Sequence, residues 1–329
     1  MKKNCDRGGT AVINKYLGID IGGTAVKMGI VDEDGNILCS YEAPVAFDHY
    51  QTPILETVLR ESEVFLDENK IKPDTLGGIG ISATGQIDTL NGIVAGSGGN
   101  IRNWDGSDLK NAFAWKYGLP VTVVNDANCV ALGEKWIGSA RNAKDVIVIT
   151  IGTGLGGGII VNDQILLGQS GFGGEVGHFS IHKQGECCTC NNRGCFEQYA
   201  SMTALVRAVS EYYAAAGTEA SGRLRNQPVN GRSIFESVAM GDEGIMQIVD
   251  TWICDISVGI VSLVHIFNPS LIVIGGGVSG QEELFIAKLR SEVMKHVMPN
   301  FRKGLELRAA ELGNRAGMIG AVYYLIQNL

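Results

Sequence analysis

The sequence predicts an α/β protein built from two related halves, and three observations point to this fold class. Short apolar runs typical of strands alternate with segments of helical apolar spacing along most of the 329 residues. A strand, a glycine turn and a second strand open the chain, and the pattern returns when residues 19–22 are aligned with residues 149–152. The length also favours two domains over one. Two related halves are the simplest explanation of the repeat.

The first half is expected to open as an antiparallel meander and to continue with helices that alternate with strands. Asp34-Gly35 marks the hairpin turn of the meander, and Thr52-Pro53 supplies an N-cap followed by proline at the first helical position. The expected elements are strands 16–21, 26–31 and 37–40, a helix from Thr52, strand 76–82, a helix from Ser107 to Gly118, strand 121–124 and helix 127–136.

The second half repeats the strand pattern and then becomes largely helical. Its expected elements are strands 146–151 and 157–161, helix 198–215, a short helix opened by a capping box of Ser233 and Glu236, helix 242–267, strand 271–274 and helix 314–327. The last helix is expected to cross back to the first half. The predicted small lobe comprises residues 1–124 and 314–329, and the predicted large lobe comprises residues 125–313.

Composition and charge argue against nucleic-acid and membrane partners. The formal net charge is -8 and the 27 Lys and Arg residues form no run, so binding to a phosphate backbone is not indicated. The longest apolar stretch, residues 256–267, is interrupted by polar side chains and is too short to span a bilayer. The opening residues lack the apolar core of a secretory signal. We therefore expect a cytoplasmic globular protein.

A cysteine-rich loop between residues 173 and 197 is the most distinctive stretch. Four of the eight cysteines crowd into it, and a histidine precedes them. His178, Cys188, Cys190 and Cys195 would supply the one imidazole and three thiolates that Zn2+ takes in closed structural sites. Such a zinc would fold the loop without doing the chemistry, because no coordination position is left for water.

Two alternatives to this zinc set stay open at this point. Disulfides would need an oxidising compartment, which nothing in the chain suggests, and the adjacent Cys187 and Cys188 pair poorly with each other. His182 competes with His178 as the histidine ligand, and facing does not decide between them, because in a strand both would point to the same side. Cys187 is expected to be a spare thiol.

Three strand ends carry glycine turns that suit phosphate. Glycine lets backbone N–H groups approach an anion closely and a threonine hydroxyl adds a donor, so facing turns would clamp a phosphate chain. The turns comprise Gly22, Gly23 and Thr24, then Gly152, Thr153, Gly154 and Gly156, and finally Gly276 and Gly277. Asp20, beside the first turn, would hold a phosphate-bound Mg2+ directly or through water. The sequence contains no P-loop pattern.

Asp126 is the candidate for chemistry. Phosphoryl transfer from ATP to an alcohol needs a carboxylate that accepts the hydroxyl proton and aims the oxygen. Asp126 stands at the carboxyl end of a predicted strand, and Asn125 beside it would bind neighbouring hydroxyls. The alternative role, an N-cap for the following helix, is compatible with the same residue, because capping occupies one oxygen and leaves the other.

A polyol substrate also needs fixed acceptors. Glu175 and Glu197 flank the cysteine cluster, so a zinc would hold them against each other, and their carboxylates suit sugar hydroxyls. Asn100 and Trp104, on the loop G-G-N-I-R-N-W, would complete the other side of the sugar. The alternative for Glu175 is a solvated carboxylate without a ligand.

Over nearly its whole length, the chain resembles the ROK family of sugar kinases and repressors. The matching pieces are D-I-G-G-T from Asp20, N-I-R-N-W from Asn100, N-D-A-N from Asn125, G-T-G-L-G-G-G from Gly152, E-V-G-H from Glu175, C-T-C-N-N-R-G-C-F-E from Cys188 and G-G-G-V-S from Gly275. Taken separately only the cysteine block is specific, whereas together the pieces are highly specific.

The resemblance implies a duplicated actin-like (ribonuclease H-like) ATPase fold with ATP and Mg2+ in a cleft between two lobes. It implies that Asp126 is the catalytic base, that Asp20, through Lys27, and the turn from Gly152 hold the ATP phosphates, and that the turn at Gly276 lies near the adenosine. The implied sugar contacts are Asn100, Asn125, Asp126, Glu175, His178 and Glu197. The implied zinc ligands are His178, Cys188, Cys190 and Cys195, which leaves His182 a bystander.

Three positions depart from the pattern of the family. The family usually has glycine where Asn103 and Asn191 stand, and proline where Thr84 stands. Asparagine tolerates the left-handed backbone region better than most residues, so the first two changes are expected to preserve their turns. Thr84 lies near the expected sugar pocket and bears on which sugar is the substrate.

The leading hypothesis is an ATP-dependent kinase for the 6-hydroxyl of a free hexose, glucose first, with N-acetylmannosamine and β-glucosides as runners-up. A repressor of the family would carry a helix-turn-helix domain before the first strand, and only fifteen residues precede Tyr16. A third hypothesis is a zinc-stabilised sugar sensor without catalysis. The resemblance also implies a homodimer.

Overall fold

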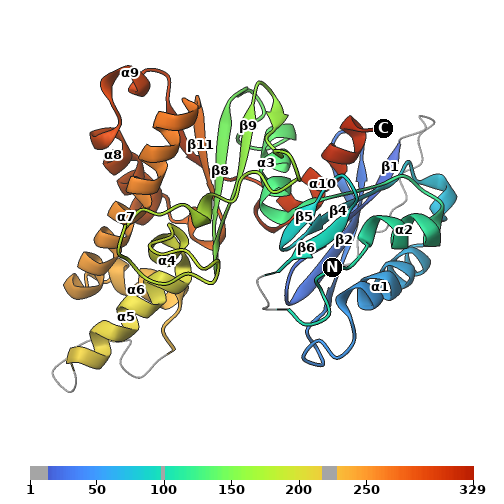
Figure 1. Cartoon of the computed structure of the whole chain (residues 1–329), viewed down its shortest axis with the longest axis horizontal. Coiled ribbons are helices and arrows are strands. Elements are labelled where there is room, and N and C mark those ends of the chain that lie inside the picture. Colours follow the sequence, from blue (N-terminus) through green and yellow to red (C-terminus); the bar gives the residue numbers. More distant parts are fainter. Residues whose placement is uncertain (1–13, 98–100, 217–227) are drawn as a thin grey trace.

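The computed structural model describes residues 14–97, 101–216 and 228–329, and it consists of two lobes that each contain a five-stranded mixed sheet (Figure 1). The first sheet comprises β1 (Lys15–Ile21), β2 (Ala25–Asp32), β3 (Ile37–Pro44), β4 (Ile79–Ala83) and β7 (Val121–Asn125). The second comprises β8 (Val146–Ile151), β9 (Leu155–Val161), β10 (Gln164–Ile165), β11 (Leu271–Gly275) and β12 (Glu306–Ala309).

The two sheets have the same strand order and the same strand directions. The first runs β3-β2-β1-β4-β7 and the second runs β10-β9-β8-β11-β12. In each, the first three strands form an antiparallel meander, and the last two extend the sheet in parallel. The predicted duplication is therefore confirmed by the topology.

Helices cover the first sheet on both faces. α1 (Ile54–Glu68) and α2 (Leu109–Tyr117) pack on one face, where Leu17, Ile19 and Ile21 of β1 join their apolar side chains in one buried cluster. Tyr16 points to the other face and packs with α10 (Ala316–Gln327). This burial on both faces explains why β1 is almost continuously apolar.

The helices of the second lobe pack around a larger core. They comprise α4 (Glu197–Ala200), α5 (Met202–Ala216), α6 (Gly231–Ala239), α7 (Glu243–Phe267), α8 (Ala287–His296) and α9 (Pro299–Arg302). By length and composition, α7 is the one helix of the described residues that could cross a membrane, but half of its most apolar window is buried inside the protein. Trp252, Ile253 and Ile256 of α7 lie in the core of this lobe. Its apolar composition is that of a core helix.

Two helices lie between the sheets and hold them together. α3 (Asp126–Trp136) follows the first sheet directly, and α10 returns from the second lobe to the first, as predicted (Figure 1). Their backbones meet closely at Gly133 and Gly320. A Cβ at Gly133 would lie 2.5 Å from the Ala316 carbonyl oxygen, and one at Gly320 would overlap the Cys129 carbonyl oxygen. Only glycine fits at this crossing.

Local sequence signals predicted the ends of most helices and strands. The remaining ends depend on long-range packing. Strand 146–151 is as predicted. The helix expected from Ser107 to Gly118 is α2, with Asp108 as its N-cap, accepting a hydrogen bond from Asn111 N–H, and Gly118 as its C-cap. The predicted strand 76–82 begins only at Ile79. The hairpin of β5 (Gln86–Asp88) and β6 (Ile93–Gly96) was not predicted, nor were α8 and β12.

Three predictions about helix ends were wrong. The helix expected at 198–215 is divided into α4 and α5 at Ser201. The capping box of α6 pairs Asn230 with Ser233, rather than Ser233 with Glu236. α1 begins at Ile54, so Pro53 is its N-cap. The division into lobes of residues 1–124 with 314–329 and residues 125–313 stays a prediction.

The helix crossing generates a prediction about stability. Gly320→Ala should lower the free energy of unfolding by about 1–3 kcal/mol, because the new methyl group overlaps backbone and forces α3 and α10 apart. Urea denaturation measures the change. Gly280→Ala is the matched control, since apart from the adjacent residues in the chain no heavy atom of the described residues lies within 4 Å of its Cβ position. Wild-type stability of Gly320→Ala would contradict the close crossing.

Candidate active site

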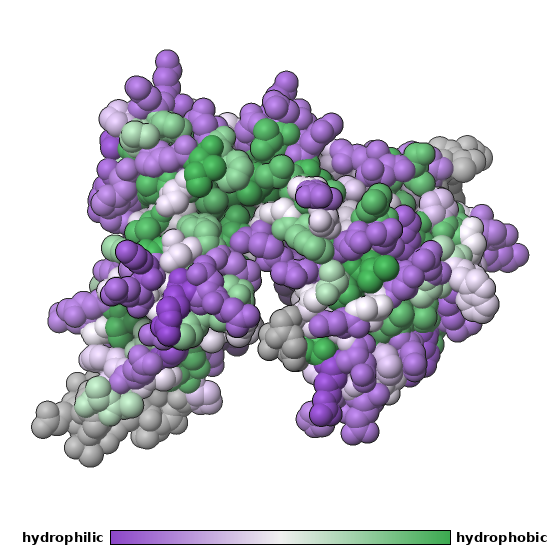
Figure 2. Space-filling model, in the orientation of Figure 1, coloured by the Kyte–Doolittle hydropathy of each residue, from purple (hydrophilic) through white to green (hydrophobic). Residues whose placement is uncertain are grey.

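A cleft of about 830 Å3 opens between the lobes, and residues of both lobes line it. Figure 2 shows it as a deep indentation between them. The predicted site residues on its wall are Asp20, Gly22, Lys27, Asn125, Asp126, Gly152, Gly154, Gly156, Glu175, His178, Cys190, Glu197, Gly276 and Gly277. Gly23, Thr24 and Thr153 are not among the lining residues. Asn100 lies outside the described residues.

Asn125 and Asp126 stand where β7 ends and α3 begins. The Asn125 side-chain oxygen accepts hydrogen bonds from the backbone N–H groups of Ala127 (2.9 Å) and Asn128 (3.2 Å). Its amide nitrogen donates to the Gly85 carbonyl oxygen (2.9 Å) and to Asp126 Oδ1 (3.0 Å). Asn125, not Asp126, is therefore the N-cap of α3. The Asn125 amide also orients the neighbouring carboxylate.

The Asp126 carboxyl group has a strongly shifted proton affinity. Burial raises the pKa of Asp126 to about 6, and the negative charge of Asp20 adds to the rise. Hydrogen bonds from the Ala127 N–H and from the Thr84 hydroxyl act in the opposite direction. A carboxyl group with this pKa exchanges a proton readily near neutral pH.

Asp20 provides a second, partly buried carboxylate in the cleft. It lies on β1 opposite Lys27 of β2, and its Oδ1 accepts a hydrogen bond from the Ser82 hydroxyl (2.6 Å). Burial raises the pKa of Asp20, and Ser82 and Lys27 partly offset that rise. Gly317, in the first turn of α10, packs against this carboxylate, since a Cβ there would lie 2.6 Å from Oδ1. Carboxylate oxygens are ligands that Mg2+ accepts.

The glycine turns present bare backbone to the cleft. Apart from the adjacent residues in the chain, no heavy atom of the described residues lies within 4 Å of the Cβ position at Gly152 or Gly277. Gly276 is constrained instead, because its φ is +92° and a Cβ would overlap the Ile151 carbonyl oxygen. The carbonyl oxygen of Thr153 accepts a hydrogen bond from the Thr203 hydroxyl (2.6 Å). The turns leave room for an anion beside the backbone.

Glu197 connects the cysteine-rich loop to the second glycine turn. It is the first residue of α4, and its Oε2 accepts a hydrogen bond from the Leu155 N–H (2.8 Å). Gly154 lies against the same oxygen, so a side chain there has no space. Glu175 precedes a 3-10 turn (Val176–His178), and burial raises its pKa. Glu197 therefore has a structural contact that the sequence did not reveal.

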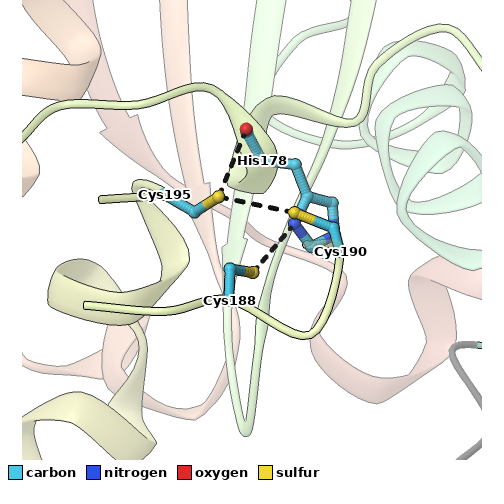
Figure 3. Close-up of side chains that lie close together, drawn as sticks. All are labelled: His178, Cys188, Cys190 and Cys195. Carbon is cyan, nitrogen blue, oxygen red and sulfur yellow. Dashed lines mark hydrogen bonds between the residues drawn. The ribbon is translucent and has the colours of Figure 1, made fainter. Parts of the chain in front are cut away.

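Figure 3 shows His178, Cys188, Cys190 and Cys195 pointing toward a common centre. One ligand atom of each residue lies within 4.8 Å of all the others. The distance between the sulfurs of Cys190 and Cys195 is 3.5 Å, and Cys188 Sγ lies 3.6 Å from His178 Nδ1. Thiolates about 2.3 Å from a tetrahedral Zn2+ lie about 3.8 Å apart, so this donor set fits such an ion.

The competing residues of the loop face elsewhere. His182 Nε2 lies 3.5 Å from Asp255 Oδ1, and its ring centroid is 4.4 Å from that of Tyr199. Cys187 is exposed and outside the four-residue cluster. His178 directs Nδ1 to the sulfurs, whereas its Nε2 lies 4.0 Å from Glu175 Oε2 in the cleft.

One residue expected in the cleft is buried instead, and three residues that line the cleft were not predicted from the sequence. Trp104 was expected beside the sugar, but it is fully buried and its indole N–H donates to the Thr84 carbonyl oxygen (2.9 Å). It fixes the end of β4, where Thr84 lines the cleft. Gln86 and Ser97 reach the wall from the unpredicted β5–β6 hairpin and its end, and Phe172 from the segment before Glu175. No local motif marks them.

The sequence profile described as "ROK family" matches residues 16–328. The chain belongs to the ROK family. It is 33% identical over 309 residues to a glucokinase of Thermotoga maritima, covering 93% of this chain and 96% of the relative. It is 34% identical over 316 residues to a β-glucoside kinase of Listeria monocytogenes, covering 95% and 98%.

Solved structures support the fold of this ROK family chain. A ROK family glucokinase from Streptomyces griseus, in complex with glucose and AMPPNP, has a TM-score of 0.79 at 32% identity, covering 95% of this chain and 100% of that one. The expected duplicated actin-like fold is confirmed. A xylose repressor of Bacillus subtilis, 30% identical, matches as well. Family membership alone therefore does not separate an enzyme from a regulator.

The two asparagines that replace family glycines have the expected backbone. Asn103 has φ +56° and Asn191 has φ +68°, both in the left-handed region. The prediction that these turns persist is confirmed. Asn191 lies inside the cysteine-rich loop, so the turn between Cys190 and Cys195 does not depend on glycine there.

Proposed function

We propose that this chain is a sugar kinase, an ATP:sugar phosphotransferase that phosphorylates the 6-hydroxyl of a free hexose, with glucose as the first candidate. The observation that carries the proposal is the Asp126 carboxyl group, whose pKa is raised to about 6, in a cleft lined by all three glycine turns and by Glu175 and Glu197. A sugar sensor needs the glutamates but has no use for the acid–base group. Whole-chain similarity to glucokinases supports the same reaction.

Asp126 is the proposed general base. Hydrogen bonds from Asn125 and from the Ala127 N–H hold Oδ1, so the direction of the carboxylate is set before substrate arrives. The carboxylate accepts the proton of the attacking hydroxyl, and the hydroxyl oxygen bonds to the γ-phosphorus as ADP leaves. Little covalent work is left to other side chains, which position the two substrates.

The proposed nucleotide contacts follow from the bare backbone of the turns. The turns at Gly22, Gly152 and Gly276 would face the ATP phosphates and adenosine with N–H groups. Asp20 would hold Mg2+ beside them, directly or through water, and Lys27 would contact the phosphates. Bound Mg2+ would neutralise charge on the phosphates. The Asp20 carboxylate fits this role, because a hard cation favours its ionised form and would offset the raised pKa.

The sugar is proposed to lie against the glutamates and the cysteine-rich loop. Its proposed contacts are Asn100, Asn125, Asp126, Glu175, His178 and Glu197. A structural zinc on His178, Cys188, Cys190 and Cys195 would hold the loop that carries the glutamates. With Nδ1 on the metal, Nε2 of His178 would be the protonated nitrogen and would donate toward Glu175 or a sugar hydroxyl.

Other substrates and roles are kept as alternatives. The β-glucoside kinase relative supports a β-glucoside as an alternative substrate, and N-acetylmannosamine is the other alternative. One substituent on the sugar is decided by a pocket difference of about 1–3 kcal/mol, and Thr84 is the chain's own departure near that pocket. A sensor or repressor would bind sugar without turnover. A homodimer and a cytoplasmic location stay predictions.

The experiment that tests the function is ADP release from ATP and Mg2+ across a panel of sugars. The panel contains glucose, N-acetylmannosamine, N-acetylglucosamine, mannose, fructose and cellobiose, each against a control without sugar. We expect one sugar, glucose first, to stand well above the rest. Sugar binding by calorimetry without any ADP release would instead support the sensor.

The pH dependence of turnover should report the Asp126 carboxyl group. Because Asp126 must be ionised to accept a proton, kcat/KM for the sugar should fall below an apparent pKa of about 6. The decline should approach tenfold per pH unit, and steady-state rates from pH 5 to 8 measure it.

Asp126→Asn should abolish turnover while sugar affinity stays close to that of the wild type.

Thr84→Val is the matched variant for this pH profile. It removes the hydroxyl that stabilises the ionised Asp126 and leaves the size of the side chain nearly unchanged. The pKa of Asp126 should rise, so the acid limb should move to higher pH. A limb that stays in place or moves lower would argue against Asp126 as the titrating group.

Removing one thiolate of the cluster tests whether the cluster binds zinc and whether the zinc supports sugar binding. Cys190→Ser should lose its zinc, measured by elemental analysis, and should bind the sugar more weakly, because the loop between Glu175 and Glu197 loses its anchor. Cys187→Ser is the control, since Cys187 lies beside the cluster but outside it. Zinc retained by Cys190→Ser, or lost equally by Cys187→Ser, would contradict the proposed ligand set.

A further inference from the structure

Glu134 is a buried acidic residue that the proposed mechanism does not use. It lies in the last turns of α3, and its exposed fraction is 0%. Among the described residues, no lysine, arginine or histidine forms an ion pair with it. A buried carboxylate without a cation is costly unless hydrogen bonds replace its hydration. The hydrogen-bond donors around Glu134 therefore indicate what its carboxylate does.

Four hydrogen bonds satisfy the Glu134 carboxylate. Oε2 accepts from Ser139 N–H (2.9 Å), from the Ser139 hydroxyl (2.9 Å) and from Glu311 N–H (3.1 Å). Oε1 accepts from Leu312 N–H (2.8 Å). Glu311 and Leu312 immediately precede the 3-10 turn (Gly313–Arg315) that continues into α10. A negative charge beside these first amides is favourable, because they carry the positive end of the helix dipole.

The donors come from the two segments in which the chain passes between the lobes. Ser139 lies on the connection from α3 to β8 of the second sheet. Glu311 and Leu312 lie on the return from β12 to α10, which packs on the first sheet. One carboxylate therefore joins both crossings, although its partners on the return are 177 and 178 residues away in the sequence.

The return segment continues along the wall of the cleft. Gly313, Asn314, Ala316 and Gly317 all line it, and Glu134 does so as well. Gly317 packs against the Asp20 carboxylate without space for a side chain. A shift of this segment would therefore change the surroundings of Asp20 before it changed those of the glutamates, which lie on other elements.

We infer that Glu134 is a positioning residue for the nucleotide side of the cleft, because its carboxylate fixes residues 311–317 against α3 and so holds the wall beside Asp20. The inference rests on the proposed nucleotide site. Glu134 touches neither substrate in this scheme. It acts through the backbone of the return segment.

Glu134→Gln tests this role at nearly constant side-chain shape. One acceptor oxygen becomes an N–H2 group, which even in its better orientation faces the Leu312 N–H as donor against donor. We expect affinity for MgADP, measured by calorimetry without sugar, to fall about tenfold. Affinity for glucose should change by less than about twofold, since the glutamates keep their own supports.

Ser139→Ala is the matched control on the same carboxylate. It removes one hydroxyl donor on the outgoing crossing and leaves the bonds from Glu311 and Leu312 in place. Its MgADP affinity should stay within about twofold of the wild type. Equal MgADP affinity in wild type and Glu134→Gln, or an equal loss of MgADP and glucose affinity, would overturn the inference.

A measurement on the wild type covers the case in which Glu134→Gln does not fold. MgADP should slow amide hydrogen exchange in residues 311–317, and glucose alone should not. Unchanged exchange in this segment, in a protein that binds MgADP, would overturn the inference while leaving the proposed function intact. A wild type that binds no MgADP would overturn the proposed function and this inference with it.

Discussion

The contact between α3 and α10 is the constraint on which the rest of the molecule depends. The two helices meet backbone to backbone at Gly133 and Gly320, and they pack between the two sheets. Because no side chains lie between the backbones at this crossing, a change of rotamer cannot compensate for a change in the distance between the helices. Asp126 begins α3 and Gly317 lies in the first turn of α10, so the crossing also fixes both against Asp20.

Three carboxylates lie on this frame in different surroundings: Glu134 is fully buried, whereas Asp20 and Asp126 are partly buried in the wall of the cleft. Glu134 receives four donors and holds two segments together. Asp20 receives a hydroxyl donor and faces Lys27 across the strand pair. Asp126 lies close enough to Asp20 for the charge of one to raise the pKa of the other. Their different surroundings yield an anchor, a candidate cation ligand and a candidate base.

The cysteine-rich loop reaches the cleft through side chains as well as through backbone. His178 faces the sulfurs with one ring nitrogen and Glu175 with the other. Glu197 follows Cys195 by two residues and accepts the Leu155 N–H of the second glycine turn. These contacts connect the cysteine-rich loop directly to the turn proposed for phosphate. The four-residue cluster can therefore support the proposed site although none of its atoms is proposed to react.

The sequence by itself determined the duplicated α/β architecture, most element ends and the residue types of the cleft, because these follow from apolar spacing, caps and motifs within a few residues. It also identified the three cysteines of the cluster, which lie close together in the chain, but it chose His178 over His182 only through the resemblance to the family. Only the tertiary structure decided that Asn125 rather than Asp126 caps α3, that Trp104 is buried with its indole N–H on the Thr84 carbonyl oxygen, and that Glu134 joins two crossings. Those outcomes depend on side-chain direction and on partners far away in sequence, and no local pattern encodes either.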